Sequence, residues 1–246
     1  MSSLTFGSLF SGIGGFDLGF ERAGMECKWQ VEIDEACNKV LQKHWPNIAR
    51  YKDVREVGKH NLESVDVICG GFPCQDVSLN GLRLGLEGKR STLWTEFLRI
   101  VCEIRPKWIV IENVRGLLSS DDGEFFRTIM YGLSINGYDA EWSIIPTGYF
   151  NNLPHKRERI FIVAYPASLG WETTKIFNRE SFKNKELSGK HSSSNDKEMG
   201  GVSNSDFCRT IDGISSWMDR LKQCGNAVVP QMAEWIGKRI VEVSND

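Results

Sequence analysis

Two residues in this sequence have a type and position suited to chemistry on a heterocyclic base. Cys74 lies in the run GGFPCQ (residues 70–75), directly after the apolar stretch Val65–Cys69, and Glu112 ends the apolar stretch Trp108–Glu112. A deprotonated thiol is a strong nucleophile, and a carboxyl group can polarise a ring nitrogen while the thiol attacks. Either residue alone is more often structural. Together they suggest covalent catalysis on a pyrimidine.

A glycine-rich turn near the N-terminus suggests a nucleoside cofactor. The run SGIGG (residues 11–15) stands between an expected strand, Leu4–Phe10, and an expected helix, Phe16–Ala23. Glycines there let the backbone bend sharply and approach a ligand. Asp17 replaces the third glycine of the dinucleotide fingerprint and would place a carboxylate near a pyrophosphate, which disfavours a nicotinamide cofactor. S-adenosylmethionine has no phosphate and carries a positive sulfonium, so an acidic surrounding suits it better.

Two acidic residues follow at the places where an adenosine would be held. Glu32 lies at the end of the expected strand Cys27–Ile33, about 20 residues after the turn, where a carboxylate can accept both ribose hydroxyls. Asp53 is expected near the end of a third strand, within reach of the adenine amine. Each acid alone would be an ordinary surface residue, but the ordered set indicates an adenosine-containing cofactor.

The elements that must position these residues alternate along residues 1–165. Short apolar runs alternate with amphipathic segments, which predicts βαβ units and a mainly parallel sheet with helices on both faces. Right-handed crossovers place the loops that follow the strands at one sheet edge, where ligands bind. Besides those named above, the expected strand is Arg159–Ala164 and the expected helices are Asp34–His44, Leu93–Ile104 and Phe125–Asn136.

The composition changes after Pro166. Residues 172–206 are rich in Lys, Glu, Ser and Asn, as in a solvated insert. Order is expected to return with helices at Ser215–Lys222 and Gln231–Val243, on either side of the run GNAVVP (residues 225–230). We therefore expect a catalytic domain at 1–165, a short recognition segment at 166–214, and C-terminal helices at 215–246 that return to the catalytic domain.

Charge and cysteine content restrict the class of protein. The formal net charge of the 246 residues is −2, so a nucleic-acid partner would require the positive charge to be clustered. The seven cysteines include no C-x-x-C pair, which gives little support to a zinc site or a disulfide framework. With no long apolar run and no basic, signal-like N-terminus, a cytoplasmic protein is expected. Basic clusters do occur, at Arg83, Lys89 and Arg90, at Lys156, Arg157 and Arg159, and at Lys175, Arg179, Lys183 and Lys185.

Six motifs, in order, resemble those of the cytosine carbon-5 DNA methyltransferases. They are FSGIGG (10–15), the acids Glu32 and Asp53, GFPCQDVS (71–78), ENV (112–114), HKRER (155–159) and GNAVVP (225–230). The matches cover residues 4–165 and 215–240, and the run around Cys74 is the most specific of them.

The resemblance implies a Rossmann-like methyltransferase fold and a set of site residues. Cys74 would attack carbon 6 of a cytosine flipped out of the duplex, Glu112 would contact N3 and the exocyclic amine, and Arg157 and Arg159 would complete the catalytic set, with Arg159 near O2. No metal is implied. The residues expected to bind S-adenosylmethionine are Phe10, Gly12, Ile13, Gly14, Gly15, Glu32, Ile33, Asp53, Val54, Pro73, Leu93, Asn226 and Ala227.

The resemblance also implies double-stranded DNA as the substrate, a monomer, a bacterial or phage origin, and a role beside a restriction nuclease acting in trans. His155 stands where the family usually has Gln, and Asn151-Asn152 replaces the usual Gly-Val. Only residues 167–214 are left for target recognition, as in compact phage and prophage enzymes. A tRNA cytosine methyltransferase and a catalytically silent DNA-binding homologue remain alternatives. The run FPCQDVS favours DNA over tRNA, and intact Cys74, Glu112 and Arg159 argue against a silent protein.

Overall fold

The computed structural model of this chain describes residues 3–73, 93–146, 157–170, 175–177 and 227–245. Several of the residues discussed above lie outside the described residues: Cys74, Asn226, the basic residues Arg83, Lys89, Arg90, Lys156, Arg179, Lys183 and Lys185, and the expected helix Ser215–Lys222.

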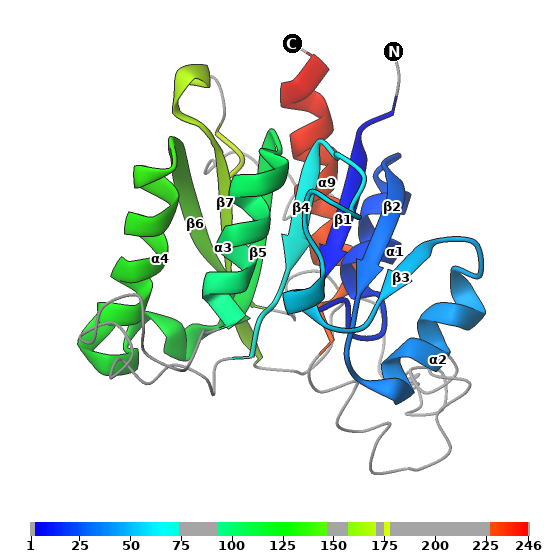
Figure 1. Cartoon of the computed structure of the whole chain (residues 1–246). Helices are drawn as coiled ribbons and strands as arrows, with labels where there is room; N and C mark the ends of the chain where they lie inside the picture. The colour runs from blue at the N-terminus through cyan, green and yellow to red at the C-terminus, as the bar shows by residue number, and fades with distance from the viewer. Residues whose placement is uncertain (1–2, 74–92, 147–156, 171–174, 178–226, 246) are drawn as a thin grey trace, which may run out of the picture.

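The described strands form one seven-stranded sheet in the order β3-β2-β1-β4-β5-β7-β6 (Figure 1). The parallel part consists of β1 (Thr5–Leu9), β2 (Glu26–Val31), β3 (Ala49–Tyr51), β4 (Val67–Gly70) and β5 (Trp108–Val114). Two antiparallel strands, β7 (Glu158–Pro166) and β6 (Tyr138–Pro146), complete the sheet beside β5. The expectation of a mostly parallel α/β sheet is confirmed.

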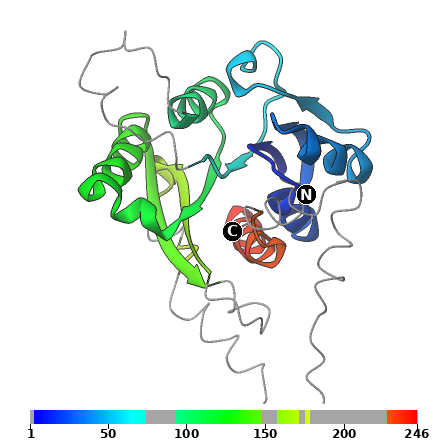
Figure 2. The same ribbon diagram turned by 90° about the horizontal axis from the view of Figure 1, so that it is seen from below.

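Helices cover both faces of this sheet, as expected. The helices α3 (Leu93–Ile104) and α4 (Glu124–Ile135) lie on one face, and α1 (Gly15–Arg22) and α9 (Pro230–Asn245) lie side by side on the other (Figures 1 and 2). The remaining long helix is α2 (Glu35–His44), which begins at Asp34 because the Asp34 side chain accepts hydrogen bonds from the N–H groups of Ala36 and Cys37. Short 3-10 turns occur at Val54–Glu56, Arg115–Leu118, Ser120–Gly123 and Ala167–Leu169.

Alternation along the strands separates two hydrophobic cores. In β5, Ile109 and Ile111 point toward α3 and α4, whereas Trp108 and Val110 point toward α1 and α9. Both sets of side chains are almost completely buried. A strand buried on both faces reads as a continuous apolar run, which is why β5 was recognisable from the sequence.

The helix α9 closes the second core. Met232, Ile236 and Ile240 of α9 are fully buried and pack in one cluster with Phe16 and Phe20 of α1. The helix α9 therefore packs against α1 and the sheet. Within the described ranges, none of the helices has the length and apolar character needed to cross a membrane.

Two features of the β7 region differ from the expectation. No strand was expected at Tyr138–Pro146, because few of these residues are deeply buried at the sheet edge and their apolar pattern is weak. The short piece 175–177, expected within a solvated insert, contributes Ile176 to the second core, where it is fully buried. Glu141 of β6 accepts hydrogen bonds from the N–H groups of Ile176 and Phe177, at 2.6 and 3.1 Å.

Candidate functional site

The glycine turn joins β1 to α1 at the carboxyl end of the parallel strands. Phe10, Gly12 and Gly14 all have positive φ, at 54°, 56° and 85°. Gly14 adopts this left-handed conformation at the N-cap of α1 without steric cost, whereas Phe10 is strained there. The N–H of Ser11 donates to the carbonyl of Val31 at 3.1 Å and ties the turn to the end of β2.

Glu32 meets this turn directly. The N–H of Gly12 donates to Glu32 Oε2 at 2.7 Å, and the N–H of Asp34 donates to Oε1 at 2.8 Å. Burial raises the pKa of Glu32, while these backbone hydrogen bonds oppose the rise. Beside it, Ile33 leaves 65% of its surface exposed, which is unusual for so large an apolar side chain. The end of β2 thus offers a carboxylate and an apolar surface side by side.

Asp53 follows β3 at the same sheet edge. Its Oδ1 accepts from the N–H of Arg55 at 2.9 Å, and its side chain is 26% exposed. The next residue, Val54, is 4% exposed with its side chain in the first core, so only its main chain is available to a ligand. The N–H of Glu32 donates to the carbonyl of Tyr51 at 3.0 Å, which joins the ends of β2 and β3.

Asp17 does not face the ligand side of the glycine turn, where the sequence predicted its carboxylate. Its side chain is fully buried and accepts hydrogen bonds from Gln30 Nε2 at 2.8 Å and Ser8 Oγ at 3.1 Å. Burial raises its pKa to about 6. The carboxyl of Asp17 therefore points between α1 and the sheet. The inference that it makes the turn acidic toward a ligand is wrong.

Glu112 lies almost completely buried near the end of β5. Its Oε1 forms an ion pair with Nε of Arg159 in β7, at 2.8 Å. The N–H of Arg159 Nε is not directed at this oxygen, so Oε1 accepts no hydrogen bond of good geometry from the described residues. Burial raises the pKa of Glu112 to about 7, and the charges of Arg159 and Arg157 oppose the rise. A carboxyl group with this pKa can both hold and release a proton near neutral pH.

The start of the Cys74 loop is packed against Glu112. A Cβ added to Gly71 would lie 2.7 Å from Glu112 Oε2, so only glycine allows this approach. Asn113 Nδ2 donates to the carbonyl of Phe72 at 3.0 Å. Phe72 is buried, whereas Pro73, the last described residue before Cys74, is exposed. The chain is therefore fixed beside Glu112 up to the residue that precedes Cys74.

The turn 227–229 lies against the glycine turn and is held by Arg157. Arg157 Nη2 donates to the carbonyl of Ala227 at 3.1 Å. A Cβ on Gly15 would lie 2.2 Å from the carbonyl oxygen of Val228, so the turn 227–229 contacts the start of α1.

Two further residues of the expected cofactor set lie on or beside helices. Ile13 packs near Val40 of α2, and Leu93 is the partly buried first residue of α3.

The described residues thus divide the expected set into two neighbouring groups. The first, around the glycine turn, contains Phe10, Gly12, Gly14, Gly15, Glu32, Ile33, Asp53 and Ala227, and the second, around Glu112, contains Arg159 and Pro73. Arg157, directly before β7, connects the start of this strand to Ala227. No metal-binding cluster occurs among the described residues.

Two residues that hold the site together, Asn113 and Arg99, had no role expected from the sequence. Asn113 fixes the Phe72 carbonyl, and Arg99 of α3 bonds the turn after Asp53. Only the spacing of Arg99 between Glu96 and Glu103 on one helix face hinted at an ion-pair network.

Solved structures with the same arrangement include a candidate DNA modification methyltransferase encoded within an E. coli prophage. Its TM-score is 0.71 at 20% identity, and the match covers 99% of this chain and 100% of that one. The S. pombe Dnmt2 methyltransferase matches with a TM-score of 0.69 at 14% identity, over the full length of both chains. At these identities the likeness establishes the fold alone.

Sequence relatives include type II methyltransferases. M.Bsp6I of Bacillus sp. is 37% identical over 164 residues, which cover 66% of this chain and 52% of the relative. M.HhaI of Haemophilus parahaemolyticus is 31% identical over 165 residues, which cover 67% and 50%. The chain thus spans about half the length of these curated relatives. The family model described as C-5 cytosine-specific DNA methylase matches residues 4–206, and the chain therefore belongs to the C-5 cytosine-specific DNA methylase family.

Proposed function

We propose that this chain is a DNA (cytosine-5-)-methyltransferase that transfers a methyl group to carbon 5 of a flipped-out cytosine through a covalent adduct with Cys74. The observation that carries the proposal is the setting of Glu112. It is a buried carboxyl with a pKa of about 7, it lies 2.8 Å from Arg159, and it is packed against the backbone that leads to Cys74.

The family uses S-adenosylmethionine, and the groups around the glycine turn fit this cofactor. The Glu32 carboxylate is suited to the ribose hydroxyls, the exposed Ile33 to the adenine face, and Asp53 to the adenine amine. The backbone of Phe10–Gly15 and Ala227 would enclose the methionine part. When bound, the cofactor supplies an electrophilic methyl group on its sulfonium.

The chain's own residues would prepare the cytosine for that methyl group. In its protonated form Glu112 can donate to N3, which makes carbon 6 more electrophilic toward the Cys74 thiolate. The attack forms a sulfur–carbon bond at carbon 6 and moves the electron pair of the 5,6 double bond to carbon 5, which becomes nucleophilic. After methylation, loss of the carbon-5 proton and elimination of the thiolate restore the ring and the enzyme. Arg159 would keep Glu112 oriented and reach toward O2.

We further propose double-stranded DNA as the substrate, with residues 1–165 and 215–246 forming the catalytic body and 166–214 the recognition segment. A base inside a duplex must leave the stack before a thiol can reach its carbon 6. The family description supports DNA as the substrate, and a restriction nuclease acting in trans is proposed as a functional partner. A monomer and a cytoplasmic location, in a bacterium or encoded by a phage, complete the proposal.

Transfer of a labelled methyl group tests the function. The protein is incubated with labelled S-adenosylmethionine and either duplex DNA or tRNA. Label is expected on DNA, and label on tRNA alone would refute the substrate. A duplex carrying 5-fluorocytosine should form a covalent complex, because fluorine at carbon 5 cannot leave as a proton does.

Matched cysteine variants test the mechanism. Cys74→Ala should abolish both label transfer and the fluorocytosine complex. Cys102→Ala is the control, because this thiol lies on α3 and donates to Asn136 Oδ1 at 3.1 Å, away from Glu112. The control should retain both activities. Equal transfer by the two variants would rule out the covalent mechanism.

A further inference from the structure

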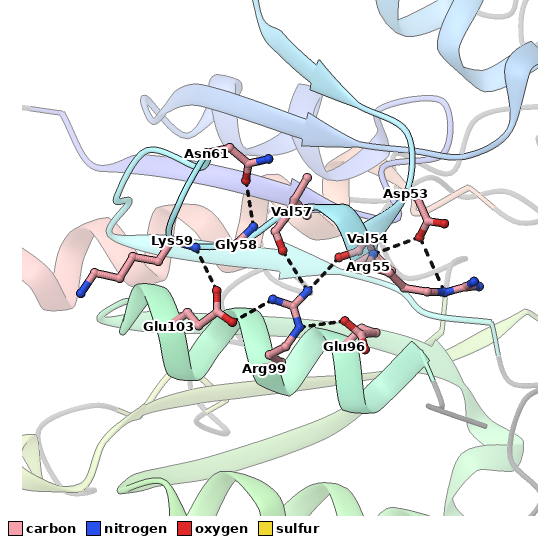
Figure 3. Close-up of polar contacts among 10 residues, drawn as sticks. All are labelled: Asp53, Val54, Arg55, Val57, Gly58, Lys59, Asn61, Glu96, Arg99 and Glu103. Atoms are coloured by element: carbon pink, nitrogen blue, oxygen red, sulfur yellow. Dashed lines mark hydrogen bonds and ion pairs between the residues drawn. The ribbon is translucent and has the colours of Figure 1, made fainter. Parts of the chain in front are cut away.

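We infer that Arg99 is a positioning residue for cofactor binding: it fixes the turn that presents Asp53 to the adenine. The inference rests on the proposed function for the identity of the cofactor. Arg99 acts through the main-chain carbonyls of Val54 and Val57 (Figure 3).

The guanidinium of Arg99 holds both sides of this turn. Nη2 donates to the carbonyl of Val54 at 3.0 Å and to the carbonyl of Val57 at 2.8 Å. Nε and Nη1 donate to Glu96 and Glu103 of the same helix, at 2.8 and 2.9 Å, which fixes the plane of the guanidinium. One planar group therefore sets the separation of two main-chain oxygens three residues apart.

Glu103 extends the same contact along the turn. Its Oε2 accepts from the N–H of Lys59 at 2.9 Å, while its Oε1 accepts from Arg99. The turn is closed on the other side by Asn61, whose Oδ1 accepts from the N–H of Gly58 at 2.9 Å. The helix α3 thus offers a donor group and an acceptor group to consecutive parts of the turn (Figure 3).

Asp53 depends on this turn for its orientation. Its Oδ1 accepts from the N–H of Arg55, so the carboxylate direction follows the main chain of residues 53–55. Val54 and Val57 anchor the turn in the first core, but apolar contacts do not fix the rotation of a peptide group. The two bonds from Arg99 fix it, because they end on the carbonyls of these same residues.

Because Arg99 lies on α3, its bonds to Val54 and Val57 also connect two parts of the site. The helix begins at Leu93, in the residues that follow the Cys74 loop, and it packs over β4 and β5. Arg99 therefore links the element that follows the nucleophile loop to the adenine side of the cofactor site. A lysine cannot reproduce this link, because a single ammonium cannot donate in one plane to two carbonyls and two carboxylates.

Binding of S-adenosylhomocysteine by calorimetry tests the inference without catalysis. In Arg99→Met the side-chain stem remains but the Val54 and Val57 carbonyls lose their donor, and affinity should fall about 5- to 20-fold. The informative comparison uses the analogue with hydrogen in place of the adenine amine. The wild type should prefer the amine, and Arg99→Met should lose most of that preference. Arg127→Met is the control, since Arg127 of α4 is exposed and pairs only with Glu124 among the residues described.

The outcomes separate the inference from the proposed function. Loss of the amine preference in Arg99→Met, with kcat at saturating cofactor nearly unchanged, supports the positioning role. An unchanged preference refutes it, even if the variant is less stable. If Arg99→Met does not fold, Arg99→Lys serves in the same comparison. A wild type that binds no S-adenosylhomocysteine refutes the proposed function. In that case, hydrogen exchange of the 55–59 amides is compared between the wild type and Arg99→Met without ligand. Faster exchange in the variant supports a turn fixed by Arg99, and an unchanged exchange rate refutes it.

Discussion

At the scale of single residues, Glu112 ties the proposed chemistry to pH. Its raised pKa, about 7, keeps the proton on the carboxyl in mildly acidic solution and releases it as the pH rises through 7. Because the proposed role needs the protonated form, kcat/KM should fall above about pH 7. Glu112→Gln cannot supply the proton and should lower kcat/KM about 100-fold or more, with this fall removed from the profile.

Methyl-transfer kinetics between pH 5.5 and 8.5 would measure the effect. Glu124→Gln is the control, because Glu124 is an exposed residue of α4 that pairs with Arg127. Its profile should match that of the wild type. A Glu112→Gln enzyme with nearly full activity would leave Glu112 without a role in proton donation.

Asp17 makes the free energy of unfolding depend on pH. Its pKa is raised from 3.8 to about 6 by burial, so the folded chain binds a proton that the unfolded chain releases between these values. This contribution to stability is fully present below pH 3.8 and is lost as the pH rises through 6, with a size of up to about 3 kcal/mol. Asp17→Asn should remove this part of the pH dependence.

Urea denaturation at several pH values from 4 to 8 would measure the free energy of unfolding. Asp139→Asn, at an exposed position of β6, is the matched control and should keep the wild-type slope. Parallel slopes for Asp17→Asn and the wild type would contradict the assignment.

Glu32 and Asp17 show how far the sequence alone could reach at this scale. Glu32 was predictable because it ends a strand, and strand ends in a parallel sheet meet at one edge. Asp17 has the same charge but starts a helix, where the direction of the side chain depends on packing. Only the structure reveals its partners Ser8 and Gln30. Arg99 was missed for a similar reason, since its acceptors are main-chain oxygens that carry no sequence signal.

At the scale of elements, residues 175–177 anchor the chain after β7. Ile176 is fully buried beside α9, and Glu141 of β6 holds its N–H. Ile176→Ala should lower the free energy of unfolding by about 2–4 kcal/mol, the usual cost of such a cavity. Leu169→Ala is the control, because Leu169 is 47% exposed and should change stability by less than about 0.5 kcal/mol. Equal small effects in urea denaturation would show that the anchor contributes little.

The elements themselves were predictable in proportion to their burial. The strands β1, β2, β4 and β5 are mostly buried, and the sequence predicted each of them to within a few residues. The edge strand β6 has mixed burial and was missed. The antiparallel direction of β7 follows from its pairing with β5 and β6. Because β6 was not predicted, the direction of β7 could not be predicted either.

At the scale of the whole molecule, α9 completes the second core. Without it, the apolar side chains that α9 covers in this core, Phe20 of α1 among them, would be exposed to water. A chain that ends at Val229 should therefore lose cooperative thermal unfolding and aggregate. Removal of Asp246 alone is the control and should leave the melting curve unchanged. Cooperative melting of the shorter chain, followed by circular dichroism, would show that α1 and the sheet suffice.

The bond between Arg157 and Ala227 joins positions 70 residues apart in the chain. On the same body, Phe177 stacks on Trp235 of α9 with ring centroids 6.1 Å apart. The described residues on either side of positions 178–226 thus contact one platform, formed by the sheet and α9. Closing a loop costs only about 0.6 kcal/mol for each doubling of its length, so such a platform tolerates inserts of very different size. A cassette exchange that replaces only the proposed recognition segment after Phe177, and ends before residue 215, would keep both contacts and leave the proposed cofactor residues Asn226 and Ala227 in place.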